Sequence, residues 1–253
     1  MRRWLGVAAA VVLAGCGQGG GPAGGSGLQA ASAAAHAAAD KFVAMAQGSA
    51  ANGQVPRQSD TAAGPLLNAV FDTAALPAQP PPFSQLDPIN DWLGSINRVG
   101  ITYILAGTGV TDISKATADV GPQTLRNVVA FAPEMGRYYD AEMAVTGAEA
   151  ATISQELAAH PDEMKSGESA DGLTKMRGGV AQMMSGVMAT LAETNNTPDW
   201  KAARAKALAA MAPSAARLLT PDAKAGLRAS ASQAAADPAL KAALNQVATT
   251  MGS

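Results

Sequence analysis

The stretch DPINDWLGSINRVGITYILAG, residues 87–107, decides the fold class of this chain. Asp87 followed by Pro88 is typical of a helix N-cap and the first helical residue, and Gly107 is typical of a helix C-terminus. Between them, large apolar side chains recur every three or four positions, which is the period of one helix face. These side chains are Ile89, Trp92, Leu93, Ile96, Val99, Tyr103 and Ile104. We therefore predict an amphipathic helix over residues 87–107.

Similar signals mark helices on both sides of this stretch. Apolar periodicity and Gly or Pro boundaries predict helices over residues 28–47, 64–76, 112–120, 121–131 and 169–194. Pro133 either kinks the 121–131 helix or starts the next one, which ends near Ala159. Three short helices that pack back on the earlier ones are predicted from Thr197-Pro198-Asp199, Thr220-Pro221-Asp222 and Asp237-Pro238. The four prolines of segment 77–82 predict an extended connector.

Composition favours the same class and excludes others. The 253 residues include 59 alanines and few aromatics (4%), which argues against a sheet-dominated fold. A formal net charge of −2 and a pI of about 5.7 exclude the basic stripe of a nucleic-acid-binding protein. A single Cys excludes a disulfide framework and a Cys-rich metal site. We expect an all-α, irregular bundle of about eight alanine-lined helices in one domain over residues 28–253.

Residues 1–15 have the form of an export signal. Arg2 and Arg3 give a basic start, and residues 4–14 form an unbroken apolar run of eleven. A membrane-spanning helix needs about 20 apolar residues, so this run fits a cleaved secretory signal peptide. The alternative is an ordinary signal peptide that is cut further along, with Cys16 incidental.

The run Leu13-Ala14-Gly15-Cys16 resembles the lipobox of bacterial lipoproteins. The resemblance implies that the Cys16 thiol takes a diacylglycerol, that the leader is cut before Cys16 and that the new amine is acylated. In the Gram-negative relatives, an Asp after the cysteine retains the protein in the inner membrane. Gly17 stands here, which implies the periplasmic side of the outer membrane, or the cell membrane where no outer membrane exists.

Residues 16–27 are expected to tether the domain to the membrane. Gly17 to Gly27 consists of small and flexible residues that have nothing to bury. Removal of residues 1–15 leaves 16 basic and 20 acidic side chains, a net charge of −4. Such a chain is weakly repelled by anionic lipid, so the acyl chains on Cys16 are the expected membrane partner.

The densest polar cluster is the main candidate for a ligand site. It consists of Glu134, Arg137, Tyr138, Tyr139, Asp140 and Glu142. One interpretation is a groove in which paired carboxylates and tyrosines face a sugar or another ligand. The interpretation that we favour is a solvated helix face with ordinary i,i+3 and i,i+4 pairs. The residues predicted to face any ligand are Trp92, Tyr103, Glu134, Tyr138 and Glu142.

Methionines and histidines raise the question of a metal site. Met176, Met183, Met184 and Met188 suggest Cu(I) binding by thioethers, but they follow a helix stripe on which methionine fills core gaps. The two histidines, His36 and His160, are more than a hundred residues apart, and the second precedes a helix-terminating Pro161. We predict core packing for the methionines, no metal site and no cofactor.

One further segment resembles the lytic transglycosylases, which are peptidoglycan-cleaving envelope lipoproteins. Gly167-Glu168-Ser169 is followed by Gly179-Val180-Ala181-Gln182, where that family has Gly-Leu-Met-Gln. The resemblance implies a catalytic role for Glu168. The later Ala-Tyr-Asn-Ala-Gly segment of the family is missing, and the residues also read as one continuous amphipathic helix, which is our interpretation.

Three functions are consistent with these patterns. The first is a non-enzymatic envelope lipoprotein that binds a protein partner or supports envelope maintenance. The second is a helical carrier of a lipid or another apolar ligand, suggested by the Met and Gly content of residues 169–194. The third is an enzyme that acts on cell-wall glycan through Glu168 or the Glu134–Glu142 cluster. We expect the first.

Overall fold

The computed structural model describes residues 26–110, 121–162, 167–192 and 196–252. Over these ranges the chain forms nine α-helices and no strand, which confirms the all-α prediction. The helices are α1 (Ser26–Ala46), α2 (Ala63–Phe71), α3 (Leu86–Ile104), α4 (Gly121–Ala130), α5 (Ala132–Ala159), α6 (Gly167–Ala192), α7 (Pro198–Leu218), α8 (Pro221–Ala234) and α9 (Lys241–Gly252). The predicted signal peptide, Cys16, most of the predicted tether and the helix predicted over 112–120 lie outside the described residues.

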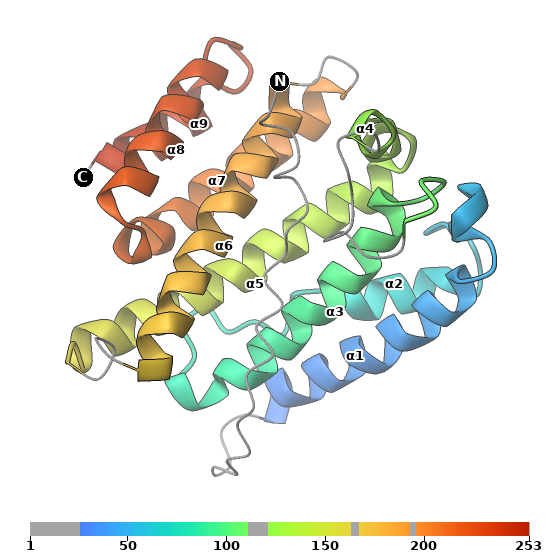
Figure 1. The fold of residues 1–253 in the computed structure, drawn as a ribbon, viewed down its shortest axis with the longest axis horizontal. Coiled ribbons are helices and arrows are strands. Elements are labelled where there is room, and N and C mark those ends of the chain that lie inside the picture. Colours follow the sequence, from blue (N-terminus) through green and yellow to red (C-terminus); the bar gives the residue numbers. More distant parts are fainter. Residues whose placement is uncertain (1–25, 111–120, 163–166, 193–195, 253) are drawn as a thin grey trace.

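The helices form a layered bundle with α5 at its centre (Figure 1). Helix α1 packs against α2 and α3, and α3 packs against one side of α5. Helix α7 packs against α5 from the other half of the chain, and it also contacts α6 and α9. Helices α8 and α9 pack against each other at the outer edge. The 28 residues of α5 therefore connect the two halves of the bundle.

Aromatic rings fill the spaces that alanine leaves between these helices. The ring centroid of Tyr103 on α3 lies 5.6 Å from that of Phe42 on α1 and 5.1 Å from that of Phe131. On α5, the Tyr139 ring lies 6.0 Å from Trp200 of α7 in an edge-to-face arrangement. Such pairs stabilise a core beyond the area that they bury. Most aromatics of the described residues therefore lie at helix contacts, whereas Phe83 is exposed.

One glycine sets the distance between α3 and α5. A Cβ built on Gly100 of α3 would lie 2.3 Å from two ring carbons of Tyr138. No real Cβ approaches a ring so closely, so the Tyr138 ring takes the place that a side chain at position 100 would need. The close approach of α3 and α5 depends on this glycine.

Most predicted helix boundaries lie within three residues of the observed ones. Asp87 is not the N-cap of α3, because the helix begins at Leu86 and Asp87 lies in its first turn. Helix α2 ends at Phe71, five residues before the predicted end at residue 76.

The caps predicted at Thr197 and Thr220 are confirmed. The hydroxyl of Thr197 accepts a hydrogen bond from the Trp200 amide at 3.3 Å, and that of Thr220 accepts one from Ala223 at 3.4 Å. Pro133 starts α5 and does not kink the preceding helix, because Phe131 has left helical geometry with ψ 31°. Residues 77–82 form no helix, as predicted.

Two predictions about the C-terminal part are wrong. The helix after Thr197 is not short: α7 runs for 21 residues and continues through Pro213. The last helix begins at Lys241, three residues after Pro238. The Asp237 carboxylate accepts the Ala239 amide at 2.9 Å, so it closes a local turn and does not cap the helix.

None of the described helices combines the length and the apolar character that crossing a bilayer requires.

Candidate functional site

The residues predicted to face a ligand lie inside the bundle. Trp92 and Tyr103 on α3 are fully buried, and on α5 Glu134 is 3% exposed, Tyr138 2% and Glu142 7%. The interpretation of the 134–142 cluster as a solvated face is therefore wrong for its glutamates and tyrosines, whereas Asp140 is exposed and Arg137 half-buried. The reason is that α5 packs on both sides, against α3 and against α7, so several of its polar residues are enclosed.

Trp92 lies apart from the other predicted residues. Its indole Nε1 donates a hydrogen bond to the Val70 carbonyl oxygen at 3.0 Å. Val70 lies near the end of α2, so this bond fixes α2 on α3. The polar atom of Trp92 is thus satisfied within the core, as buried indoles require.

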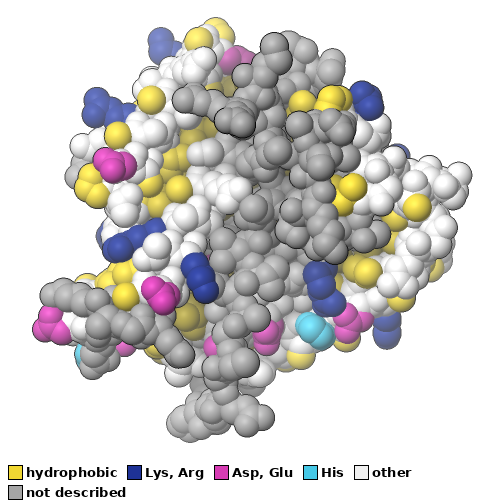
Figure 2. All heavy atoms as spheres, viewed as in Figure 1, with side chains coloured by type: hydrophobic (Ala, Val, Ile, Leu, Met, Phe, Trp, Pro, Cys, Tyr) yellow, Lys and Arg dark blue, Asp and Glu magenta, His cyan; other side chains and the backbone are white. Residues whose placement is uncertain are grey.

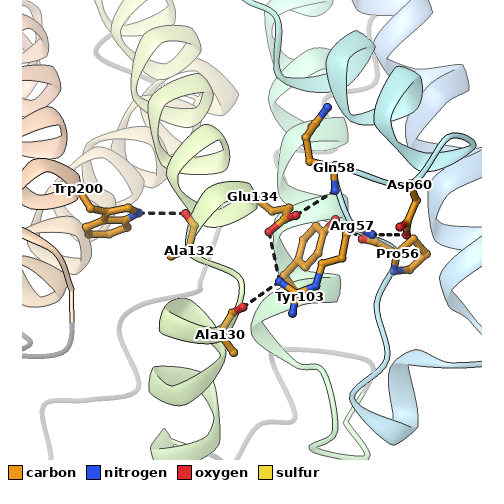
Figure 3. A network of polar contacts seen from close by, with 9 residues as sticks. All are labelled: Pro56, Arg57, Gln58, Asp60, Tyr103, Ala130, Ala132, Glu134 and Trp200. Atoms are coloured by element: carbon orange, nitrogen blue, oxygen red, sulfur yellow. Dashed lines mark hydrogen bonds and ion pairs between the residues drawn. The ribbon is translucent and has the colours of Figure 1, made fainter.

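Tyr103 and Glu134 meet around the segment that follows α1 (Figure 3). The Tyr103 hydroxyl donates to the Pro56 carbonyl oxygen at 2.6 Å. The Glu134 Oε1 accepts the Gln58 amide at 2.9 Å, and its Oε2 lies 3.5 Å from the Arg57 guanidinium. We call this set, Pro56, Arg57, Gln58, Tyr103 and Glu134, the Glu134 network.

The periphery of the Glu134 network is cationic. The Arg57 guanidinium donates to the Ala130 carbonyl oxygen at 2.8 Å and stacks 4.2 Å from the Phe131 ring centroid. Arg137 donates to the side chains of Gln58 and Asn68. Burial lowers the pKa of Arg137, and nearby carboxylates oppose that effect. These two cations balance the buried charge of Glu134, as a buried carboxylate requires.

The hydroxyl of Tyr103 is held in its protonated state. Burial raises its pKa far above the ordinary value of 10, and the negative charge of Glu134 raises it further. A phenol in this environment acts as a hydrogen-bond donor to Pro56 and not as a base. The Glu134 network therefore fixes the segment that follows α1 against α3 and α5.

A second polar group lies further along α5. The Tyr138 hydroxyl donates to the Asn97 Oδ1 of α3 at 3.2 Å. Burial raises the pKa of the Glu142 carboxyl to about 7, and a hydrogen bond with Tyr138 opposes that shift. Tyr138 and Glu142 thus interact at i,i+4, as the sequence predicted, but inside the core.

Glu149 was not predicted from the sequence. It lies seven residues, or two helical turns, after Glu142, so both carboxyls lie on one face of α5. Burial alone raises the pKa of Glu149 to about 7. The i,i+7 spacing from Glu142 is the sequence signal that could have identified Glu149. In the structure, Thr146 is buried between the two carboxyls.

Asp140 has a structural partner on α7. Arg204 forms a two-pronged contact with its carboxylate, with Nε 2.9 Å from Oδ1 and Nη2 on Oδ2. Trp200 lies one turn earlier on α7 and donates from Nε1 to the Ala132 carbonyl oxygen at 3.1 Å. Gly136 leaves room for both side chains, since a Cβ there would lie 2.9 Å from Arg204. These contacts fasten α7 to α5.

The methionines behave as the core prediction requires. Met176, Met184 and Met188 of α6 are buried in the apolar core of the bundle, and Met183 is partly buried and packs against that core. His36 lies on an exposed part of α1, 3.6 Å from Asp40, and His160 lies at the C-terminal end of α5. Within the described residues, no group of three His, Cys, Asp or Glu could hold a metal ion.

Glu168 belongs to the first turn of α6. This helix runs without interruption from Gly167 to Ala192 and includes Gly178 and Gly179. The interpretation of this segment as one continuous helix is confirmed.

Comparison with known proteins adds no relative. No protein-family model matches this chain, and neither a curated protein nor a solved structure matches it. The class that the structure itself defines is a layered all-α domain whose buried polar groups join its helices.

Proposed function

We propose that this chain is an exported bacterial lipoprotein, anchored through acyl chains on Cys16, whose helical domain binds a protein partner and performs no catalysis. The observation that carries the proposal is the run Leu13-Ala14-Gly15-Cys16 after a basic start and eleven apolar residues. The only cysteine of the chain occupies the position at which the lipobox places the acylated residue. Acylation also leaves no free thiol in an oxidising compartment.

The binding role is supported by what the polar groups of α5 and α3 do. Glu134 holds the amide of Gln58 and the cation of Arg57, and Asp140 holds Arg204. Tyr103 donates to a backbone carbonyl. Each of these groups is engaged in joining one element to another, so the 134–142 cluster serves the fold. A membrane-anchored domain whose helices are held together in this way exposes its outer helices, which are available to bind a protein partner.

The physical chemistry of the anchor fits a durable attachment. One acyl chain holds a protein only marginally, whereas two or three chains hold it stably, at about 0.8 kcal/mol per buried CH₂. The mature net charge of −4 gives no attraction to anionic lipid. Gly17 supports the outer membrane as the destination in a Gram-negative cell.

Expression of the full chain in a Gram-negative host tests the anchor directly. We expect mass spectrometry to find a mature N-terminus at Cys16 with three acyl chains, and the protein to enter the detergent phase on phase separation. Cys16→Ser should keep residues 1–15 and stay in the aqueous phase. The matched control is Cys16→Ser combined with Ser26→Cys, which restores a thiol at another position and should stay unacylated. A wild-type chain with a free Cys16 thiol would refute the proposal.

A further inference from the structure

A shallow groove lies between α8 and α9, away from the α5 site. Its volume is about 500 Å³. Lys224, Arg228 and Ser232 of α8 line one wall, and Met251 and Gly252 of α9 line the other. The three α8 residues follow each other at i,i+4, so they lie on one face of the helix.

The two cations of the groove have no acidic partner in residues 198–252. None of the described residues that line the groove is acidic, and neither Lys224 nor Arg228 forms an ion pair there. The Arg228 guanidinium lies close to the end of α9, since a Cβ on Gly252 would lie 3.4 Å from its Nη1. Two unpaired cations one helical turn apart are complementary to a carboxylate.

The groove belongs to the basic part of a chain that is otherwise acidic. Residues 198–252 carry seven Lys or Arg and three Asp or Glu, a net charge of +4. Residues 17–197 carry nine basic and seventeen acidic side chains, a net charge of −8. Figure 2 shows dark-blue side chains, together with magenta ones, over the region that α8 and α9 occupy in Figure 1. The long-range field of the molecule therefore directs an acidic partner to this end.

We infer that the α8–α9 groove binds a carboxylate-bearing segment of a protein partner. Lys224 and Arg228 would receive the carboxylates, and the exposed Ser232 would offer a neutral hydrogen bond. The inference rests on the proposed function, since it names the chemistry of the partner that the anchored domain binds.

A membrane surface fits the groove less well than a peptide. Helices that lie on a bilayer insert large apolar side chains next to their cations. Among the described residues, the exposed large hydrophobic side chains are Met45 and Phe83, at 41% each, and both lie in the N-terminal half. The α8–α9 surface is concave and has no such side chain, so a protruding acidic segment matches it.

Binding of a fluorescein-labelled hexaglutamate peptide to the full-length chain, in non-ionic detergent at low salt, tests the inference by fluorescence anisotropy. Lys224→Ala with Arg228→Ala should weaken binding by about fivefold to tenfold. The matched control is Lys206→Ala with Arg217→Ala, which removes the same charge from exposed positions of α7 and should change binding less than about twofold. Circular dichroism verifies that both variants fold, and Lys224→Gln replaces the double variant if it does not.

Several outcomes would overturn the inference. Equal weakening by both double variants would assign binding to net charge and not to the groove. Absence of peptide binding would refute the inference. Lys224-dependent binding to phosphatidylglycerol vesicles without peptide binding would refute it as well. The anchor is tested separately, because the groove variants keep Cys16 and should still enter the detergent phase. Peptide binding by a chain with an unacylated Cys16 would refute the proposed anchor and leave the groove intact.

Discussion

Gly100 is the residue at which the packing of two central helices is most constrained. The ring of Tyr138 on α5 occupies the space next to the Cα of Gly100. The Tyr138 hydroxyl donates a hydrogen bond to Asn97, which lies on α3 as Gly100 does. A glycine inside a helix costs about 1 kcal/mol relative to alanine, so α3 is intrinsically weakened at this point. The contact between α3 and α5 offsets that cost, because it buries a tyrosine ring.

We expect Gly100→Ala to lower the free energy of unfolding by about 1–3 kcal/mol, since its methyl group must displace the Tyr138 ring. Gly94→Ala is the matched control on the same helix. No atom lies within 4 Å of a Cβ at that position, so Gly94→Ala should stabilise the protein by about 0.5–1 kcal/mol. Urea unfolding measures both changes. Equal effects of the two substitutions would contradict the packing account.

At the scale of elements, the Glu134 network holds the segment between α1 and α2. This segment has no regular structure after the 3₁₀ turn at Ala50–Asn52. Its order therefore depends on contacts with other elements, namely Tyr103 of α3 and Glu134 of α5. A buried carboxylate at the first turn of α5 also interacts favourably with the positive end of that helix.

Glu134→Ala should destabilise this segment selectively. The substitution leaves the Gln58 amide without its acceptor, which costs about 1–3 kcal/mol. Glu134→Gln keeps a neutral acceptor and loses only the charge opposite Arg57, so its cost should be smaller, about 1 kcal/mol or less. Hydrogen exchange read by mass spectrometry should show faster exchange of residues 54–62 in Glu134→Ala. Unchanged exchange there would show that the network does not hold the segment.

At the scale of the whole molecule, the buried carboxyls of α5 make stability depend on pH. Burial raises the pKa of Glu142 and of Glu149 to about 7 from an ordinary value of 4.5. The folded state therefore binds protons more tightly than the unfolded state does. Below about pH 4.5 both states are protonated and burial of these carboxyls carries no charge penalty. The penalty grows as the pH rises and is complete above pH 7.

We expect the free energy of unfolding of the wild type to fall between pH 5 and pH 8. Glu149→Gln should reduce this fall by up to about 3 kcal/mol, because it removes one of the two raised pKa values. The variant should thus be more stable than the wild type at pH 8 and nearly equal to it at pH 4.5. Glu156→Gln, half-buried on the same helix, controls for the loss of one carboxylate. Urea unfolding across this range provides the measurement, and parallel pH profiles for wild type and Glu149→Gln would contradict the prediction.

The sequence predicted the helices well and the environment of their polar residues poorly. The stripe from Ile89 to Ile104 became the buried face of α3, and Thr197 and Thr220 became caps, because periodicity and capping act within one or two turns. The Glu134–Glu142 cluster was assigned to solvent, because nothing local indicates that α5 is covered on both sides. Gln58 and Glu134 are separated by 76 residues, so no spacing rule connects them.

Helix type, most boundaries and the core role of the methionines were thus determined by the sequence alone, since they follow from backbone capping and from one apolar stripe per helix. The tertiary structure alone decided which polar groups are buried, which cations pair with them, and that Lys224 and Arg228 line a groove. The physical reason is that burial and electrostatics depend on distances between elements, and these distances are set only when the helices pack.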